Sequence, residues 1–257
     1  MKSTITLTFS ESVENHAKMQ IIGNKAKRGY SVELLKNLSE KYGGEYIDLS
    51  GWLPIDVQID ETIEKEEAGI LIIRNGVEKI FGIKKEEIYE EQKKLEVDKK
   101  CFMYGRVVNK HARHNLCFSD FSQEPDYENK KGRVIDFKDD RIKLTNELRN
   151  KMGEMGEEFK KLNAEGNYYY DIEKTFIGAH GDSERRKVIG VRLGEEFPLY
   201  YHWYYKNEKV GELCSIEMRG GDVYIMSDKA VGNDWKCRNK YTLRHAAGYL
   251  KNIKEFK

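Results

Sequence analysis

The chain has 257 residues, 35% of them charged, and its formal net charge is only +1. This length allows one large domain, or a catalytic domain with a small addition, and is enough to bury a substantial core. The balance of charge excludes a polybasic nucleic-acid binder over the whole chain and leaves room only for a local basic groove.

The cysteines and the apolar segments bear on the cellular compartment. Cys101, Cys117, Cys214 and Cys237 form no CxxC pair and no zinc-ribbon spacing. The first residues lack the apolar run of a signal peptide, and no stretch of about 18 apolar residues could span a membrane. We therefore expect an intracellular protein, cytoplasmic or nuclear, with free thiols and no membrane association.

The first 66 residues combine signals for strand and helix. The expected elements are an alternating strand at 5–9, a helix that Ser31 caps and Gly43 ends, a strand and turn at 45–54, and an acidic linker or surface turn at 60–67. We predict that residues 1–66 form a small N-terminal α/β extension of unknown role. Residues 67–257 would then form the main domain.

The middle of the chain mixes strands with two helices. The expected strands are 69–77, which Asn75-Gly76 ends, and 101–108. The expected helices are an exposed one at 84–95 and a longer one at 141–161, whose core face carries Leu148, Met152, Met155 and Phe159 at helical spacing.

After Gly166 the pattern becomes that of a β-protein. Short runs rich in β-branched and aromatic residues lie at 167–172, 187–193, 198–205, 215–219 and 222–226, separated by turn signals. Many short strands with turns indicate a sandwich, barrel or jelly roll. The fold class that we predict is α+β, with a double-stranded β-helix (jelly-roll) core and flanking helices.

The strongest local signal for chemistry is the segment 177–184, Ile-Gly-Ala-His-Gly-Asp-Ser-Glu. Because alternate residues of a strand point to one side, His180 and Asp182 can present an imidazole and a carboxylate to one metal ion. Two histidines and one carboxylate form the facial triad of non-haem iron(II) oxygenases. His-x-Asp alone is a common tripeptide, and the alternative is a loop histidine beside a surface aspartate.

The order of the following segments resembles the AlkB-like family of iron(II)- and 2-oxoglutarate-dependent dioxygenases. In that family an HxDxE segment precedes an apolar strand, here ending in Arg192-Leu193-Gly194. A strand similar to G-[SD]-L-x-x-M follows at 221–226, and a tryptophan follows as Trp235. The resemblance covers roughly residues 70–257 and is strongest from 176 to 226.

The resemblance extends upstream to two further segments. Tyr168-Tyr169-Tyr170 occupies the place of the family's Asn-x-Tyr strand, which implies that Tyr170 hydrogen-bonds 2-oxoglutarate and that Tyr168 replaces the asparagine. Residues 112–120 are similar to the family's substrate lid, which makes Arg113, Asn115 and Asp120 candidate substrate contacts. A solvated basic loop is the alternative for the lid.

Glu184 and Arg185, which directly follow the His-x-Asp motif, are further candidates for substrate binding. Arg185 and its neighbour Arg186 can either contact substrate or pair with acidic neighbours.

The third metal ligand departs from the family pattern. The family's distal histidine closely follows the tryptophan, but here the chain reads Trp235-Lys236-Cys237-Arg238. We expect His245, the only histidine downstream of 222–226, to complete the set after a longer loop. A Cys237 thiolate is the alternative ligand, and a structural core histidine is the alternative role for His245.

The residues expected to bind the distal carboxylate of 2-oxoglutarate also differ from the family pattern. The family places arginines on its last strand, whereas the basic residues of 249–257 are all lysines. If 249–256 is a strand, Lys251 or Lys254 would face inward and hold the carboxylate as a point charge. Arg244 is the competitor, although its position beside His245 would turn it away from the metal on a regular strand.

The resemblance implies an oxygenase that hydroxylates a C–H bond with Fe(II) and 2-oxoglutarate. The family's substrates favour a methylated nucleobase in DNA or RNA, presented as a single strand or a flipped base. The alternatives are hydroxylation of a protein side chain or small metabolite, and a jelly-roll binding module without catalysis.

Overall fold

The structure, a computed structural model, describes residues 2–53 and 66–256 and is a mixed α+β fold built mainly of antiparallel strands. An eight-stranded sheet has the order β4 (Glu45–Asp48), β5 (Gly69–Ile73), β15 (Val223–Met226), β12 (Val188–Gly194), β1 (Thr4–Ser10), β10 (Asn163–Tyr169), β8 (His114–Ser119) and β9 (Val134–Asp136). A four-stranded sheet has the order β11 (Ile177–His180), β16 (Thr242–Ala247), β13 (Leu199–Tyr205) and β14 (Glu208–Ile216). Two hairpins pair β2 (Ser12–Glu14) with β3 (Ile21–Gly23) and β6 (Lys100–Met103) with β7 (Arg106–Asn109).

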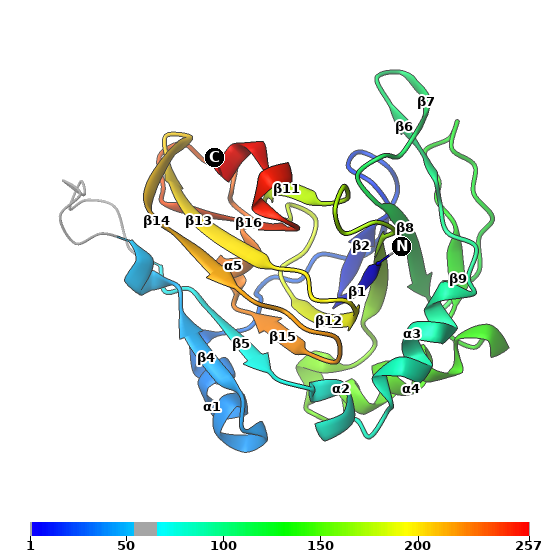
Figure 1. Cartoon of the computed structure of the whole chain (residues 1–257), viewed down its shortest axis with the longest axis horizontal. Coiled ribbons are helices and arrows are strands. Elements are labelled where there is room, and N and C mark those ends of the chain that lie inside the picture. Colours follow the sequence, from blue (N-terminus) through cyan, green and yellow to red (C-terminus); the bar gives the residue numbers. More distant parts are fainter. Residues whose placement is uncertain (1, 54–65, 257) are drawn as a thin grey trace.

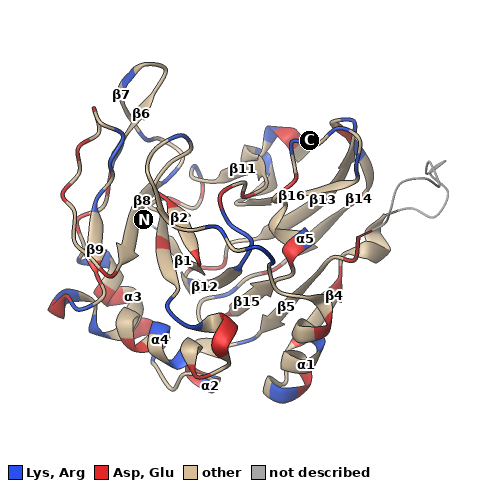
Figure 2. Ribbon diagram, turned by 180° about the vertical axis from the view of Figure 1, so that it is seen from behind, with Lys and Arg blue, Asp and Glu red and all other residues tan. Residues whose placement is uncertain are grey.

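The helices are few and short. They are α1 (Val32–Tyr42), α2 (Gly76–Lys79), α3 (Lys85–Lys93), α4 (Lys143–Gly153) and α5 (Asp228–Val231). In Figure 1, α2, α3 and α4 lie below the larger sheet, and the smaller sheet lies on its other side. Lysines and arginines alternate with acidic residues along α1, α3 and α4, as Figure 2 shows, so these helices present no surface of a single charge. Within the described residues no helix has the length and hydropathy needed to cross a membrane.

The first strand explains how the larger sheet separates its two faces. Strand β1 pairs with both β10 and β12, and all seven of its residues are buried. Ile5, Leu7 and Phe9 enter the hydrophobic core between the sheet and the helices, because alternate residues of a strand point to opposite faces. Its other face carries Thr4, Thr6, Thr8 and Ser10, and this polar face points into the space between the two sheets.

In the neighbouring strands, too, alternate side chains face opposite sides of the sheet. Ile189, Val191 and Leu193 of β12 join the core on the helix side, which also contains Leu148, Met152 and Phe159. A second core fills the space between the sheets with side chains of both, among them Tyr169 of the larger sheet and Trp203 and Leu243 of the smaller. The two sheets therefore pack face to face.

Residues 1–66, predicted as an extension, supply two strands of the larger sheet. Strand β1 lies between β12 and β10, and β4 lies at the sheet edge beside β5. Helix α1, which Ser31 caps as predicted, packs against β5. The segment is therefore part of the sheet that builds the interior. Most of the predicted acidic linker at 60–67 lies outside the described residues.

Three other predictions of local structure need correction. Residues 101–108 form a hairpin instead of one strand, because Tyr104 and Gly105 adopt positive φ angles of 56° and 77° and turn the chain. The predicted helix 141–161 ends as α4 at Gly153, and a 3-10 turn, Glu157–Phe159, continues its apolar face.

The end of the chain is the third correction. Residues 249–256 form two 3-10 turns, Leu250–Asn252 and Lys254–Phe256, instead of a strand. The last strand is therefore β16, which carries His245.

Candidate metal centre

Three side chains from distant parts of the sequence converge between the sheets. His180 ends β11, Asp182 follows two residues later, and His245 lies in β16. One ligand atom from each lies within 4.8 Å of the others. The three residues that the sequence suggested as a metal site are thus brought together. Cys237, the alternative ligand, is exposed and does not belong to this group.

Strand pairing fixes the two histidines opposite each other. Strand β11 pairs with β16 so that His180 faces His245, and the two ring centroids are 4.5 Å apart. On its other side His245 pairs with Tyr201 of β13. The expected continuous strand stops at His180, and Asp182 reaches the site from the segment that follows.

A glycine makes that segment sterically feasible. A Cβ atom on Gly181 would lie 2.1 Å from the Gly232 carbonyl oxygen, so no other residue fits without a backbone shift. The backbone N–H of Asp182 donates to the Val231 carbonyl at 3.0 Å. Asn233 donates its side-chain amide to the carbonyls of Asp182 and Arg185, at 3.0 and 2.9 Å. The backbone around Asp182 is therefore held on both sides.

A hydrogen bond orients the imidazole of His180, and burial acts on the imidazole of His245. Nδ1 of His180 lies 2.8 Å from the Gly178 carbonyl, which can only accept, so Nδ1 donates this bond and Nε2 is the nitrogen that faces Asp182. Burial, followed by repulsion from His180, lowers the pKa of His245 to about 3, so this ring is neutral. The Nε2 atoms of His180 and His245 lie 3.4 and 3.9 Å from Asp182 Oδ1.

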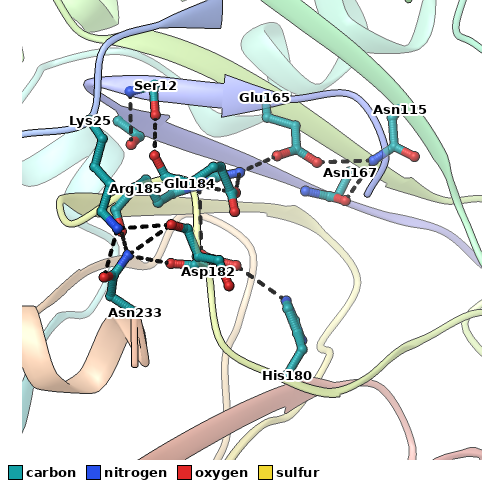
Figure 3. A network of polar contacts seen from close by, with 12 residues as sticks. Ser12, Lys25, Asn115, Glu165, Asn167, His180, Asp182, Glu184, Arg185 and Asn233 are labelled. Carbon is teal, nitrogen blue, oxygen red and sulfur yellow. Dashed lines mark hydrogen bonds and ion pairs between the residues drawn. The ribbon is translucent and has the colours of Figure 1, made fainter. Parts of the chain in front are cut away.

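A buried guanidinium supports the carboxylate of Asp182 (Figure 3). Nη2 of Arg185 lies 2.7 Å from Glu165 Oε2 and 2.6 Å from Glu184 Oε1, and its Nε lies 3.7 Å from Asp182 Oδ2. Burial alone would raise the pKa of Asp182, but Arg185, His180 and His245 together hold it below its ordinary value. Three carboxylates share one guanidinium, and the resulting formal charge of −2 favours a divalent cation.

The three candidate metal ligands line a cavity of about 680 Å³ between the sheets. Strands of both sheets contribute to it, and it contains polar residues for which the sequence analysis proposed no role: Thr6, Asn167, Tyr169, Arg192 and Tyr224. One signal for them existed in the sequence. The alternation in 4–10 placed threonines on one whole face of a strand, and a polar face on a central strand indicates a lined cavity.

Tyr170, which the sequence predicted to bind the cosubstrate, does not line the cavity, whereas the neighbouring Tyr169 does. Strand β10 ends at Tyr169, whose side chain lines the cavity together with Asn167. Tyr170 lies outside it, stacked on His114, with its hydroxyl donating to the His111 carbonyl at 2.7 Å. Tyr168 points to the opposite face, where its hydroxyl donates to Gln92. The cavity-facing pattern Asn-x-Tyr is thus 167–169.

The two residues predicted to anchor a carboxylate lie elsewhere. Lys254 is exposed in the final 3-10 turn. The Arg244 guanidinium covers the Tyr204 ring at 3.9 Å and donates to Asn207, on the outer side of β16. The prediction that Arg244 faces away from the metal agrees with this position. Lys251, the other lysine considered, pairs with Glu173.

Of the candidate substrate residues, all but Asp120 lie in or directly behind the cavity wall. Arg113 lines the cavity and donates to Asn167. Asn115 is buried and bonds to Glu165 and Asn167, at 3.1 and 2.9 Å, so it supports the cavity wall. Glu184 and Arg185 line the cavity but pair with each other, which agrees with the alternative that Arg185 has acidic partners.

Asp120 has a structural role instead. Both of its carboxylate oxygens accept from Arg149, at 2.6 and 2.9 Å, and it lines no part of the metal cavity. The guanidinium of Arg149 also lies over the Phe137 ring at 4.1 Å. This ion pair joins the end of β8 to helix α4 and contacts the core under the sheet.

The chain is similar in sequence to a viral protein. A scan against models of protein families finds no match. A protein of Acanthamoeba polyphaga mimivirus, described as uncharacterized protein R156, is 45% identical over 262 residues, and the alignment covers 99% of each chain. The chain therefore belongs to the same protein family as this mimivirus protein.

Proposed function

We propose that the protein is an AlkB-like, non-haem Fe(II)- and 2-oxoglutarate-dependent dioxygenase. The observation that carries this proposal is the convergence of His180, Asp182 and His245 in one cavity between the sheets. Two imidazoles and one carboxylate are the donor set of a facial triad, which leaves coordination positions of iron(II) open toward the cavity.

The donors fit the metal in geometry and in chemical type. Nε2 of His180, Nε2 of His245 and Oδ1 of Asp182 would hold iron(II), because these atoms already face one another. When bound, iron(II) supplies the oxygen chemistry that couples oxidation of 2-oxoglutarate to hydroxylation of a substrate C–H bond. The protein's own part is to orient the ligands, through Arg185 and the Gly178 carbonyl, and to exclude water.

The double-stranded β-helix belongs to the same proposal. Two facing, mainly antiparallel sheets with ligands on β11, directly after β11, and on β16 support it. In this arrangement the triad lies between the sheets, where a small cosubstrate can be enclosed. We further propose that Asn167 and Tyr169 take the cosubstrate-binding role first assigned to Tyr170, because their side chains line that enclosure.

The surroundings of the cavity favour a nucleobase as substrate. A second cavity of about 840 Å³ shares His16 and Arg113 with the first. Basic side chains dominate its charged lining, which includes Lys100, Arg106 and Lys110 against Glu128. Tyr104, 87% exposed at the tip of the β6–β7 hairpin, adds an aromatic face. Basic residues with an exposed aromatic ring suit a single strand or a flipped base.

Turnover tests this function directly. With Fe(II), oxygen and an N-methylated single-stranded oligonucleotide, the protein should convert 2-oxoglutarate to succinate and release formaldehyde in equal amounts. The Asp182→Ala variant should do neither. Oligonucleotide affinity that falls steeply with salt would support the nucleic-acid substrate. Salt-insensitive turnover of a protein or small acid would favour the alternative substrates, and absence of any succinate would favour a non-catalytic module.

A further inference from the structure

The loop that carries Asp182 and Arg185 belongs to no helix or strand. Residues 181–187 connect the end of β11 at His180 to the start of β12 at Val188. Backbone N–H and C=O groups outside regular secondary structure need other partners, because leaving them unpaired inside a protein is costly. The side chains that supply those partners therefore decide how firmly this part of the metal site is held.

Glu11 binds the last residues of this loop through its carboxylate. It lies in the bend between β1 and β2. Its Oε1 accepts from the backbone N–H of Arg186 at 2.7 Å and from that of Ala26 at 3.0 Å. Its Oε2 accepts from the backbone N–H of Lys187 at 3.0 Å and from the Ser10 hydroxyl at 3.0 Å. These bonds to a charged acceptor are stronger than neutral ones, and they join three segments of the chain.

Further side chains of the N-terminal segment bind the same loop. Ser12 donates its hydroxyl to the Glu184 carbonyl at 2.6 Å. Lys25 donates to the Ser183 carbonyl at 3.0 Å and to the Asn233 side chain at 2.8 Å. Figure 3 shows Ser12, Lys25 and Asn233 gathered around the loop. The N-terminal segment, whose role the sequence left open, therefore holds the loop at several successive residues.

The contacts of Glu11 end one residue away from the guanidinium that supports the metal site. Arg186 directly follows Arg185, whose Nε lies 3.7 Å from Asp182 Oδ2. Because the peptide unit is rigid, a backbone shift at Arg186 moves the backbone of Arg185 with it. Movement of Arg185 in turn alters its contact with the carboxylate that is offered to the metal.

We propose that Glu11 is a positioning residue of the metal centre, which acts on Arg185 through the backbone of Arg186 and Lys187. The carboxylate needs both of its oxygens for this task, because each accepts from one backbone N–H of the loop. This role makes the N-terminal segment part of the framework of the site. The inference rests on the metal centre of the proposed function, but the restraint on the loop can be measured without a metal.

The variant Glu11→Gln tests this role. Its amide has the shape of the carboxylate, but the NH2 group cannot accept, so one of the two backbone N–H groups loses its partner. Calorimetry with Co(II) should show an affinity about fivefold or more below that of wild type, a smaller loss than for a group that contacts a ligand directly. Unchanged Co(II) affinity overturns the proposal. If Glu11→Gln does not fold, Glu11→Asp, which keeps the charge but is shorter, replaces it in every comparison.

Glu91 of α3 provides a matched control below the larger sheet, away from the metal cavity. Its carboxylate also accepts from two successive backbone N–H groups, of Leu144 at 2.7 Å and of Thr145 at 2.9 Å, and from the Thr145 hydroxyl at 2.7 Å. Glu11→Gln and Glu91→Gln should both lower the Tm, but Glu91→Gln should keep the Co(II) affinity within about twofold of wild type. Equal weakening of Co(II) binding in both variants would assign the loss to general destabilisation and overturn the proposal.

Combining Glu11→Gln with Arg185→Lys tests whether the effect passes through Arg185. Residues that act through one chain of contacts have non-additive effects. The double variant should therefore bind Co(II) about as weakly as Arg185→Lys alone. Losses of affinity that multiply overturn the proposal.

Hydrogen exchange of the metal-free protein, followed by NMR, distinguishes failure of the metal centre from failure of this inference. At least one of the Arg186 and Lys187 amides should exchange about 10-fold faster in Glu11→Gln than in wild type, because its hydrogen bond is lost. If wild type binds no Co(II) while exchange rises in the variant, the proposed function fails and the restraint by Glu11 stands. If Co(II) binds but exchange is unchanged, the metal centre stands and the role of Glu11 is overturned.

Discussion

Arg185 contacts one oxygen of Asp182 and leaves the other to the histidines. Its Nε lies 3.7 Å from Oδ2, whereas Oδ1 faces the Nε2 atoms of His180 and His245. A charged neighbour that occupies one carboxylate oxygen fixes which oxygen is presented to a metal. Arg185 is therefore a positioning residue of the site, although its own side chain would not bind the metal.

The first prediction concerns Arg185→Lys. Lysine keeps the charge among Asp182, Glu184 and Glu165 but cannot reach all three with one planar fork. We expect a folded variant whose Zn(II) or Co(II) affinity, measured by calorimetry, falls about 10-fold, the lower end of the range for such supporting groups. Metal affinity equal to that of wild type would mean that Asp182 needs no such support.

The second prediction separates two adjacent tyrosines. Tyr169→Phe should weaken 2-oxoglutarate binding to the Zn(II) protein about 10-fold, because it removes a buried hydroxyl from the cavity wall. Tyr170→Phe is the matched control. It removes only the bond to the His111 carbonyl, so its affinity should stay within about twofold. The reverse order of effects would restore the assignment of Tyr170.

The third prediction concerns Glu14, which lines the cavity from β2. Burial raises its pKa to about 7, with Glu184 adding to the effect. The raised pKa means that the folded protein favours the protonated carboxyl. Its contribution is fully present below pH 4.5 and is lost as the pH rises through about 7.

Glu14→Gln removes this dependence. At pH 5 the variant and wild type should have nearly the same Tm. At pH 8.5 the variant should be more stable by about 1 kcal/mol, a value reduced for the partial exposure of the side chain. A stability difference that is identical at both pH values would show that Glu14 does not titrate in this range.

Much of the fold followed from periodicity. The α+β class, strands β5, β12, β13 and β15, and helices α1 and α3 lie where the sequence predicted them. The hairpin at 101–108 was missed because Tyr104, a residue that rarely takes a positive φ, makes its turn. The position of β1 in the middle of the sheet was also missed, since pairing between residues about 150 to 190 apart leaves no local signal.

Part of the candidate site could also be predicted from the sequence, and part could not. His180 and Asp182 are close in sequence, and few histidines compete for the third position, so the candidate set was short. Tyr169 was missed because the Asn-x-Tyr pattern was placed at 168–170, and a shift of one residue along a strand moves every side chain to the opposite face. Arg192 was read as part of an apolar strand, and only the sheet packing reveals that its side chain is buried in the cavity.

The most direct test of the account is anaerobic titration with Fe(II) and 2-oxoglutarate, followed by the weak visible charge-transfer band of the chelate. Wild type and Cys237→Ala should develop the band, since Cys237 is exposed and lies outside the metal group. His180→Ala, Asp182→Ala and His245→Ala should not. A band that persists in His245→Ala and vanishes in Cys237→Ala would contradict the proposed metal centre.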